Sequence, residues 1–335
     1  MKETIKKMLP SKLIERIQRI KTYHSLCSAY KKEAKRFAIS YAAPACTSKT
    51  QIESLLIFYV HQIEKGFSFD AYQYGRGKNA LHNIALLIKE LAAVDVDWRN
   101  NIVYKDAVLA LGEYRHRHMA AGRDISYMTT LFPQDINAAI IESSKTKYPN
   151  ISLSYADKKD NDTVPFSVLV ERRHAIRSYS DKPVCRKELE QAIRLSLRTP
   201  SVCNRQPARI RIFTDKDIIT QALKIQGGFG GYNMPPALML ITADLQAFMG
   251  INERNEGYVD GGLFSMSLLY SLETCGLAAC PLNTMFNDLV ATETRRLLHV
   301  PDNEVFVMYI AVGHFRETSR ICRSQRFGLD RILMN

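Results

Sequence analysis

Two stretches decide the fold of this chain: Arg172-Arg-His-Ala-Ile-Arg-Ser-Tyr179 and Thr199-Pro-Ser-Val-Cys-Asn-Arg-Gln-Pro207. The first places Arg173, His174 and Arg177 within five residues, and arginine forks bind phosphate through paired hydrogen bonds. The second places hydroxyl and amide groups on a loop bracketed by prolines, and amides read both donors and acceptors on a ring edge. Together the stretches suit a ligand with an anionic tail and a flat, hydrogen-bonding head.

Flavin mononucleotide (FMN) is such a ligand, and both stretches resemble the opening motifs of the FMN-dependent nitroreductase family. Three later pieces follow in that family's order: Asp260-Gly-Gly opening an apolar helix, Gly276-Leu-Ala-Ala-Cys-Pro-Leu-Asn283, and Ala311-Val-Gly-His314 before a basic tail. The resemblance covers about residues 165–335. The family usually has Ser where this chain has Ala175, so one hydroxyl on the phosphate side is missing.

The resemblance implies an α+β domain over residues 165–335, a mixed sheet flanked by helices. It also implies an intertwined homodimer with flavins at the interface, NADH or NADPH as electron donor, and an electron-poor small-molecule acceptor. A main-chain N–H of the Pro281–Asn283 turn would lie near the hydride-accepting flavin nitrogen. No catalytic side chain and no metal ligand is assigned. The predicted cofactor-binding residues are Arg173, His174, Ala175, Arg177, Pro200, Ser201, Asn204, Gln206, Pro281, Leu282, Asn283, Arg323 and Arg326.

The composition is that of a globular protein, with 46% hydrophobic and 24% charged residues, and 335 residues are enough for two domains. No apolar run approaches the ~20 residues that cross a bilayer. The seven cysteines are widely spread and contain no Cys-x-x-Cys. This pattern argues against disulfides or zinc and predicts a cytoplasmic location.

The basic excess is concentrated in residues 1–150, which hold 23 Lys+Arg against 14 Asp+Glu, whereas the remainder holds 23 against 20. One interpretation is an anionic partner, such as a membrane surface touched peripherally. The other, which we favour, is a solvated basic helix face. Nucleic acid is an unfavoured partner because no aromatic-rich basic cluster accompanies the charge.

Residues 1–148 are predicted to be an all-α domain, because apolar residues recur there at helical spacing and no strand pattern appears. The first helix, over 11–43, has an apolar seam spaced by about 3.5 residues, which is close to a coiled coil. The seam is poor in Leu and Ile after position 20, so we expect it to pack on its own domain. Further helices are expected over 48–66, 78–93 and 98–121, and from Pro133.

The second predicted helix ends in His61-Gln-Ile-Glu-Lys-Gly66, a cluster of ionisable groups. His61 and Lys65 are four residues apart and share a face. The stretch resembles one in nitroreductase-family proteins encoded with cell-surface polysaccharide pathways. The alternative is a helix end whose cations suit the helix dipole.

Residues 149–164 are polar and are predicted to be a linker. Beyond it, strands are expected near 209–213, 238–242, 279–283 and 305–312, with helices between them, which is an α+β pattern. Because the helical half carries none of the flavin motifs, we expect it to be dispensable for flavin reduction.

Two other functions stay open. The chain could be a flavin-binding adaptor without turnover, docking by its basic helical domain to a membrane or glycosyltransferase complex. It could also be a nucleic-acid-binding helical protein with a degenerate flavin domain. The intact set of flavin-motif residues argues against degeneracy.

Overall fold

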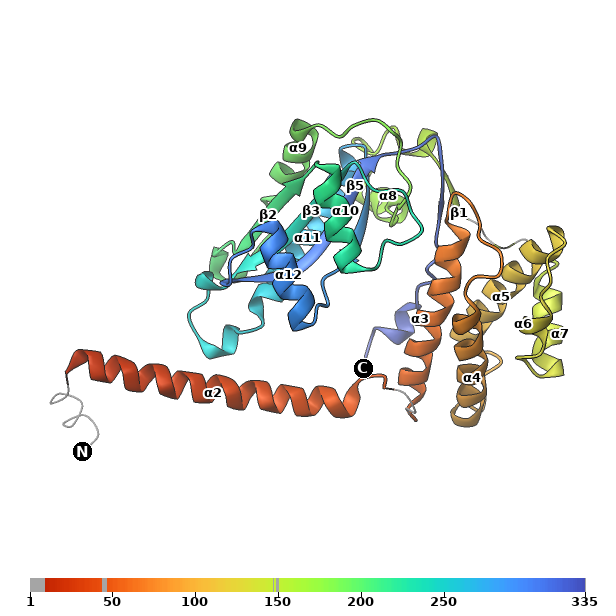
Figure 1. The fold of residues 1–335 in the computed structure, drawn as a ribbon, viewed down its shortest axis with the longest axis horizontal. Helices are drawn as coiled ribbons and strands as arrows, with labels where there is room; N and C mark the ends of the chain where they lie inside the picture. Colours follow the sequence, from red (N-terminus) through yellow and green to blue (C-terminus); the bar gives the residue numbers. More distant parts are fainter. Residues whose placement is uncertain (1–9, 44–46, 147, 149–150, 335) are drawn as a thin grey trace.

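The computed structural model describes residues 10–43, 47–146, 148 and 151–334. A helical bundle lies beside a sheet domain, and one long helix extends away from the bundle (Figure 1). The predicted α+β class, preceded by a helical region, is confirmed. The described residues before position 151 contain helices and no strand. Residues 1–9, 44–46, 147, 149 and 150 of the predicted helical domain and linker lie outside the described part.

The long helix α2 (Ser11–Ser40) contradicts the expectation that it packs on its own domain. It has no buried residue, and its seam side chains Leu13, Ile17, Ile20, Tyr30 and Phe37 are exposed. Its contacts include an ion pair between Glu33 and Arg254 of the sheet domain and a hydrogen bond from Gln51 Nε2 to Ser40 O at 3.1 Å. The reason for the difference is that the bundle closes its own core without this helix.

The bundle consists of α3 (Lys49–Phe67), α4 (Lys78–Val94), α5 (Ile102–Ala120), α6 (Ser126–Thr129) and α7 (Gln134–Ser143). The predicted capping box starts α3, with Ser48 N–H donating to Gln51 Oε1 at 3.3 Å. Apolar residues at helical spacing on α3, α4 and α5 bury one another completely, including Leu56, Leu81, Ile84, Ile88, Leu91 and Leu111. The bundle therefore has a core of its own.

The predicted linker is folded from residue 151 onward, which corrects that assignment. Strand β1 (Ile151–Ser154) pairs antiparallel with β6 (Thr318–Ile321). The short helix η1 (Tyr155–Lys158) then buries Lys158, whose Nζ lies 2.5 Å from Glu273 Oε1. Polar composition suggested a solvated segment, but these polar groups have buried partners instead.

The sheet consists of β2 (Ala208–Phe213), β3 (Ala237–Asp244), β5 (Glu304–His314) and β4 (Leu277–Asn283), paired in that order. The prediction named a mixed sheet, whereas each of the ladders between these strands is antiparallel. The helices of this domain are α8 (Phe166–Arg172), α9 (Arg186–Ser196), α10 (Lys216–Gln226), α11 (Glu256–Thr274) and α12 (Asp288–Leu298).

Alternation along β3 explains the two layers that cover the sheet. Leu238 and Leu240 face a core built with α10 and α12, whereas Met239 and Ile241 face a core built with α9 and α11. Figure 1 shows α10 and α12 in front of the sheet and α11 behind it.

The C-terminal tail after β6 returns to the helical bundle (Figure 1). Arg323 forms an ion pair with Asp106 of α5, and Arg331 forms one with Glu53 of α3. Ser324 N–H donates to Glu64 Oε2 at 3.3 Å. The tail therefore links the two halves of the molecule.

Candidate functional site

The two predicted motifs lie at opposite edges of the four-stranded sheet. The first runs beside edge strand β4, where Ile176 N–H donates to Ala279 O at 3.0 Å. The Pro281–Asn283 turn ends that same strand, whereas the loop 200–207 leads into the other edge strand, β2. Three strand spacings of ~4.8 Å separate the edges, so the motifs of one chain are roughly 14 Å apart across the sheet.

Arg173 caps the C-terminus of α8, and its Nε is buried without a hydrogen-bond partner among the described residues. A buried donor without a partner costs free energy, so this position is suited to an incoming acceptor. Beside it, His174 Nδ1 lies 2.8 Å from Arg172 O. Burial lowers the pKa of His174, and the charges of Lys158, Arg173 and Arg326 lower it further. The hydrogen bond to Arg172 O opposes this shift, but the net effect favours the neutral form of the imidazole.

Arg177 follows Ile176, the residue that is hydrogen-bonded to β4. Its Nη1 is 3.5 Å from Cys322 Sγ, and its guanidinium carbon is 5.9 Å from the centre of the Tyr232 ring. Within the part of the chain that the structure describes, no carboxylate lies within 4.0 Å of Arg173 or Arg177. Ala175 packs against the sheet core between them. Among the described residues, the edge of β4 thus carries cations without a carboxylate in direct contact; the nearest interaction is the weaker attraction between Arg173 and Glu273.

The loop at the other edge is held in a strained conformation. Cys203, Asn204 and Gln206 have positive φ angles of 46°, 56° and 49°, and each such residue costs ~1 kcal/mol or more. Two hydrogen bonds hold this loop. The Ser201 hydroxyl accepts from Gln206 N–H at 2.9 Å, and the Asp260 carboxylate accepts from Val202 N–H at 3.1 Å. A strained loop fixed in this way presents the exposed Asn204 and Gln206 amides in a set orientation.

Asp260 has a role that the sequence did not reveal. The sequence placed it only at the opening of an apolar helix, whereas its buried carboxylate fastens the amide-bearing loop to α11. A cavity of about 250 Å³ lies beside this contact, lined by Pro200, Ser201, Gln206 and Asp260 among others. Spacing alone could not find this contact, because it joins residues 58 positions apart.

The residues of the predicted turn Pro281–Asn283 differ in their exposure to solvent. Leu282 is buried in the core that faces α10, and Pro281 is half-buried. Asn283 is exposed, and its main-chain O accepts from Gln226 Nε2 at 3.1 Å. The turn is therefore tied to the glycine-rich loop 226–231.

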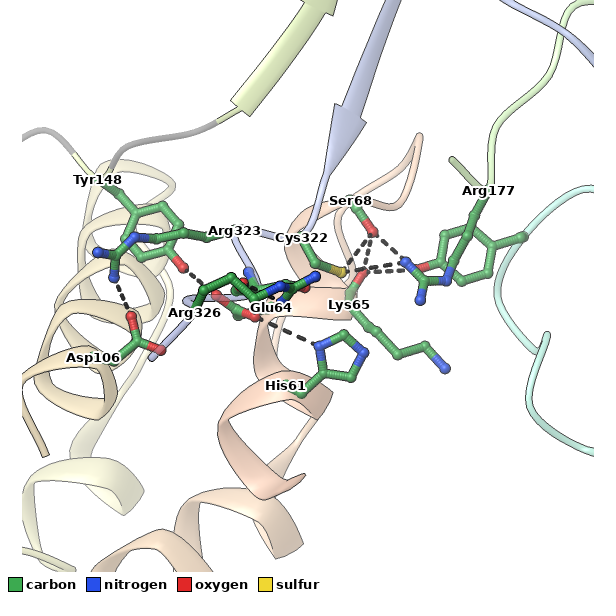
Figure 2. Close-up of polar contacts among 12 residues, drawn as sticks. His61, Glu64, Lys65, Ser68, Asp106, Tyr148, Arg177, Cys322, Arg323 and Arg326 are labelled. Atoms are coloured by element: carbon green, nitrogen blue, oxygen red, sulfur yellow. Dashed lines mark hydrogen bonds and ion pairs between the residues drawn. The ribbon is translucent and has the colours of Figure 1, made fainter. Parts of the chain in front are cut away.

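The two predicted tail arginines have different surroundings (Figure 2). Arg323 is held by Asp106 of the helical bundle, so its charge is already neutralised. Arg326 donates to Ser324 O at 2.6 Å and lines a cavity of about 260 Å³ together with His61. Of the two, Arg326 is the one available to an anion beside His174.

The sequence missed how closely α3 approaches Arg177. Figure 2 shows Lys65 and Ser68 beside Arg177 and Cys322. Ser68 Oγ lies 2.8 Å from Tyr232 OH, 164 residues away in the chain. The cluster His61–Gly66 was the available signal, but nothing in a single sequence shows what such a cluster faces.

Neither a membrane-spanning helix nor a metal site emerges from the described ranges. None of their helices is both long and apolar enough to cross a bilayer. They also contain no group of three or more His, Cys, Asp or Glu residues placed to hold a metal ion.

Comparison with known proteins matches the sheet domain. The model of the nitroreductase family matches residues 170–314. FMN reductase (NAD(P)H) of Bacillus subtilis (strain 168) is 24% identical over 155 residues, which are 42% of this chain and 61% of that protein. The chain thus spans less than two thirds of the length of this relative.

Among solved structures, the FMN-dependent nitroreductase of Clostridium difficile R20291 is 20% identical, with a TM-score of 0.39 over 44% of this chain and 85% of that chain. A nitroreductase family protein of Clostridium difficile 630 is 21% identical, with a TM-score of 0.41 over 51% and 98%. The family match, and not these distant likenesses, decides the assignment. It runs from the last turn of α8 to the end of β5, and residues 170–314 are a nitroreductase family domain.

Proposed function

We propose that this protein binds FMN and passes hydride from NADH or NADPH to an electron-poor small molecule. The observation that carries the proposal is the pair Arg173 and Arg177 beside β4. Neither has a carboxylate within 4.0 Å in the described chain, and Arg173 has a buried Nε that lacks an acceptor. A phosphate dianion fits this need, because it offers several strong acceptors to a guanidinium. The match of residues 170–314 to the nitroreductase family supports the same ligand.

Each part of the chain then has a task. Arg173 and Arg177 hold the phosphate, with Arg326 as a third cation and neutral His174 beside them. The Asn204 and Gln206 amides recognise the ring edge, and the Pro281–Asn283 backbone supports the ring. FMN, when bound, supplies the hydride-carrying chemistry, and the protein supplies position and electrostatics.

The active form we propose is a homodimer with the flavins at its interface. The support is the separation of the two motifs. The cations beside β4 and the amides before β2 lie at opposite edges of the sheet of one chain. A second copy would bring its amide loop to the first copy's cations. Its interface would cover exposed apolar side chains of the sheet domain, including Met249, Tyr258, Val259, Leu263 and Met285.

For the physiological acceptor we propose an enone, imine or sugar-linked intermediate of cell-surface polysaccharide biosynthesis. This finer proposal rests on the resemblance of His61-Gln-Ile-Glu-Lys-Gly66 to stretches in proteins of such pathways. A nitroaromatic or quinone would serve as its laboratory substitute.

Turnover tests the proposal against the adaptor alternative. Under argon, one equivalent of NADH or NADPH should reduce the FMN bound to the full chain, and oxidation should continue only when a quinone is added to reoxidise the flavin. Double-reciprocal plots should be parallel, because donor and acceptor use one site in turn. Bound FMN that neither donor reduces would instead identify a flavin-binding adaptor.

A further inference from the structure

The end of α3 contacts both halves of the molecule: Phe67 packs in the bundle core, whereas the residues that follow enter the core of the sheet domain. Phe69, which follows this helix, is buried in the same core as Phe229 and Tyr232. Its ring stands edge-on to that of Tyr232, with the ring centres 4.8 Å apart. Asp70 accepts from Arg316 at 2.6 Å. Residues 65–70 are therefore fixed to the sheet domain by apolar and polar contacts.

This fixing brings Lys65 to the β4-edge cations. Its half-buried Nζ donates to Gly228 O at 2.9 Å, in the glycine-rich loop. Ser68 Oγ donates to Lys65 O at 2.8 Å and meets Tyr232 OH, and the Tyr232 ring lies against Arg177. Figure 2 shows the Lys65 and Arg177 side chains in the same cluster.

The cluster has an excess of positive charge. Burial lowers the pKa of Lys65, and the charge of Arg177 lowers it further. No carboxylate lies within 4.0 Å of Lys65 in the described ranges. Its surroundings are the Gly228 carbonyl, the Arg177 guanidinium and the thiols of Cys280 and Cys322. Like charges held together in partly buried positions repel each other, and an anion between them removes that cost.

We propose that Lys65, a residue of the helical half, binds the same phosphate as Arg177, so that the helical half completes the FMN site. The inference rests on the proposed FMN function and adds a ligand from outside the nitroreductase domain. It reverses the expectation that the helical half is dispensable. The competing role for Lys65 is purely structural. In that role its hydrogen bond to Gly228 O only fixes the glycine-rich loop.

Comparing FMN with riboflavin separates the two roles, because riboflavin has the same ring but no phosphate. Lys65→Met in the full chain should weaken FMN binding by about 10- to 100-fold, since a hydrogen bond between charged groups is lost. It should change riboflavin binding by less than about twofold. Lys65→Arg keeps the charge and should stay within a few-fold of the wild type for both flavins. The matched control is Lys89→Met on the exposed face of α4, which should change neither affinity.

Titration of apo-protein followed by flavin fluorescence gives every affinity, and circular dichroism checks each variant's fold. Equal weakening of FMN and riboflavin by Lys65→Met would overturn the proposal and leave the structural role. Unchanged FMN affinity would overturn it as well. If Lys65→Met does not fold, Lys65→Arg and Lys65→Gln decide, since only the charged variant should keep the preference for FMN over riboflavin. A wild type that binds neither flavin would instead contradict the proposed function, and this inference with it.

Discussion

Arg173 has an unsatisfied hydrogen-bond donor, because its buried Nε has no acceptor in the described chain. An anion that satisfies it gains a charge-assisted hydrogen bond worth ~1.5–3 kcal/mol. Arg177 and Lys65 extend the same positive edge. At this scale we propose that these cations bind one phosphate.

We expect Arg173→Ala to weaken FMN binding by roughly 10- to 100-fold, at ~1.4 kcal/mol for each factor of ten. Arg173→Lys should recover only part of the loss, because a point charge cannot replace a planar fork. Ala175→Ser should leave the affinity unchanged or strengthen it slightly by restoring a hydroxyl. Fluorescence titration measures all three against Arg198→Ala, an exposed arginine of the same domain. Wild-type affinity in Arg173→Ala would place the phosphate elsewhere, with Arg326 the next candidate.

Asp106 should make the free energy of unfolding depend on pH. Burial, and then the charge of Glu64, raise the pKa of Asp106 to about 6, and the ion pair with Arg323 only partly offsets them. Between its ordinary pKa of ~3.9 and this value, the folded chain holds a proton that the unfolded chain has released. The contribution of Asp106 to the free energy of unfolding therefore falls as pH rises through that window.

Urea unfolding of the wild type and Asp106→Asn at pH 4, 5, 6 and 7 checks this. The free energy of the wild type minus that of the variant should fall as pH rises, because only the wild type titrates at this position. A difference that grows with pH would mean that the Arg323 ion pair outweighs burial.

At the scale of elements, the glycine-rich loop is shaped by Phe69. Gly231 has φ of +94°, and a Cβ there would lie 2.7 Å from Phe69 Cζ. Gly231→Ala should therefore lower the free energy of unfolding by about 2–3 kcal/mol through backbone strain and overpacking. Gly230→Ala is the matched control, since a Cβ there meets nothing within 4 Å and its φ is not left-handed. Equal unfolding midpoints in urea would show that Phe69 does not constrain the loop.

The buried pair Lys158 and Glu273 anchors the segment before α8. Burial raises the pKa of Glu273, and Lys158 opposes that shift. Lys158→Met leaves the carboxylate unpaired and should cost ~3–5 kcal/mol, most of which Lys158→Met with Glu273→Met should restore. Lys159→Met, at an exposed position, is the control. Thermal unfolding in which the two lysine variants behave alike would contradict the anchoring role.

Most elements could be predicted from the sequence because hydrophobic period and capping chemistry are local. The four predicted strands matched β2, β3, β4 and β5 closely in position, and the capping box that starts α3 has the predicted hydrogen bond from Ser48 N–H to Gln51 Oε1. What local patterns could not give are contacts between distant residues. Examples are β1 pairing with β6, Asp260 fastening the amide loop, and Lys65 reaching Gly228. The predicted linker, residues 149–164, is folded from residue 151 onward for the same reason: its partners are distant in the chain.

At the scale of the whole molecule, the two halves form one connected structure. The tail pairs with α3 and α5, and residues 65–70 enter the sheet domain. By contrast, α2 has no buried residue. The halves should therefore depend on each other, whereas the long helix should be separable.

A fragment that starts at Asn161 should fail to retain FMN, because it lacks β1, Lys158 and residues 65–70. A fragment that starts at Thr47 keeps all of these and loses α2. We expect it to bind FMN with the full-length affinity and to unfold within a few degrees of the full chain. A stable, flavin-binding fragment from Asn161 would show that the helical half is an independent appendage.

The most direct test of the central claim is the identity of the flavin that the full chain selects. Purified protein would be incubated with equal FMN, FAD and riboflavin, freed of unbound flavin, denatured, and analysed by mass spectrometry. A site built from Arg173, Arg177 and Lys65 around one terminal phosphate predicts FMN, at about one molecule per chain. Retention of FAD, of riboflavin in equal amount, or of no flavin would contradict it.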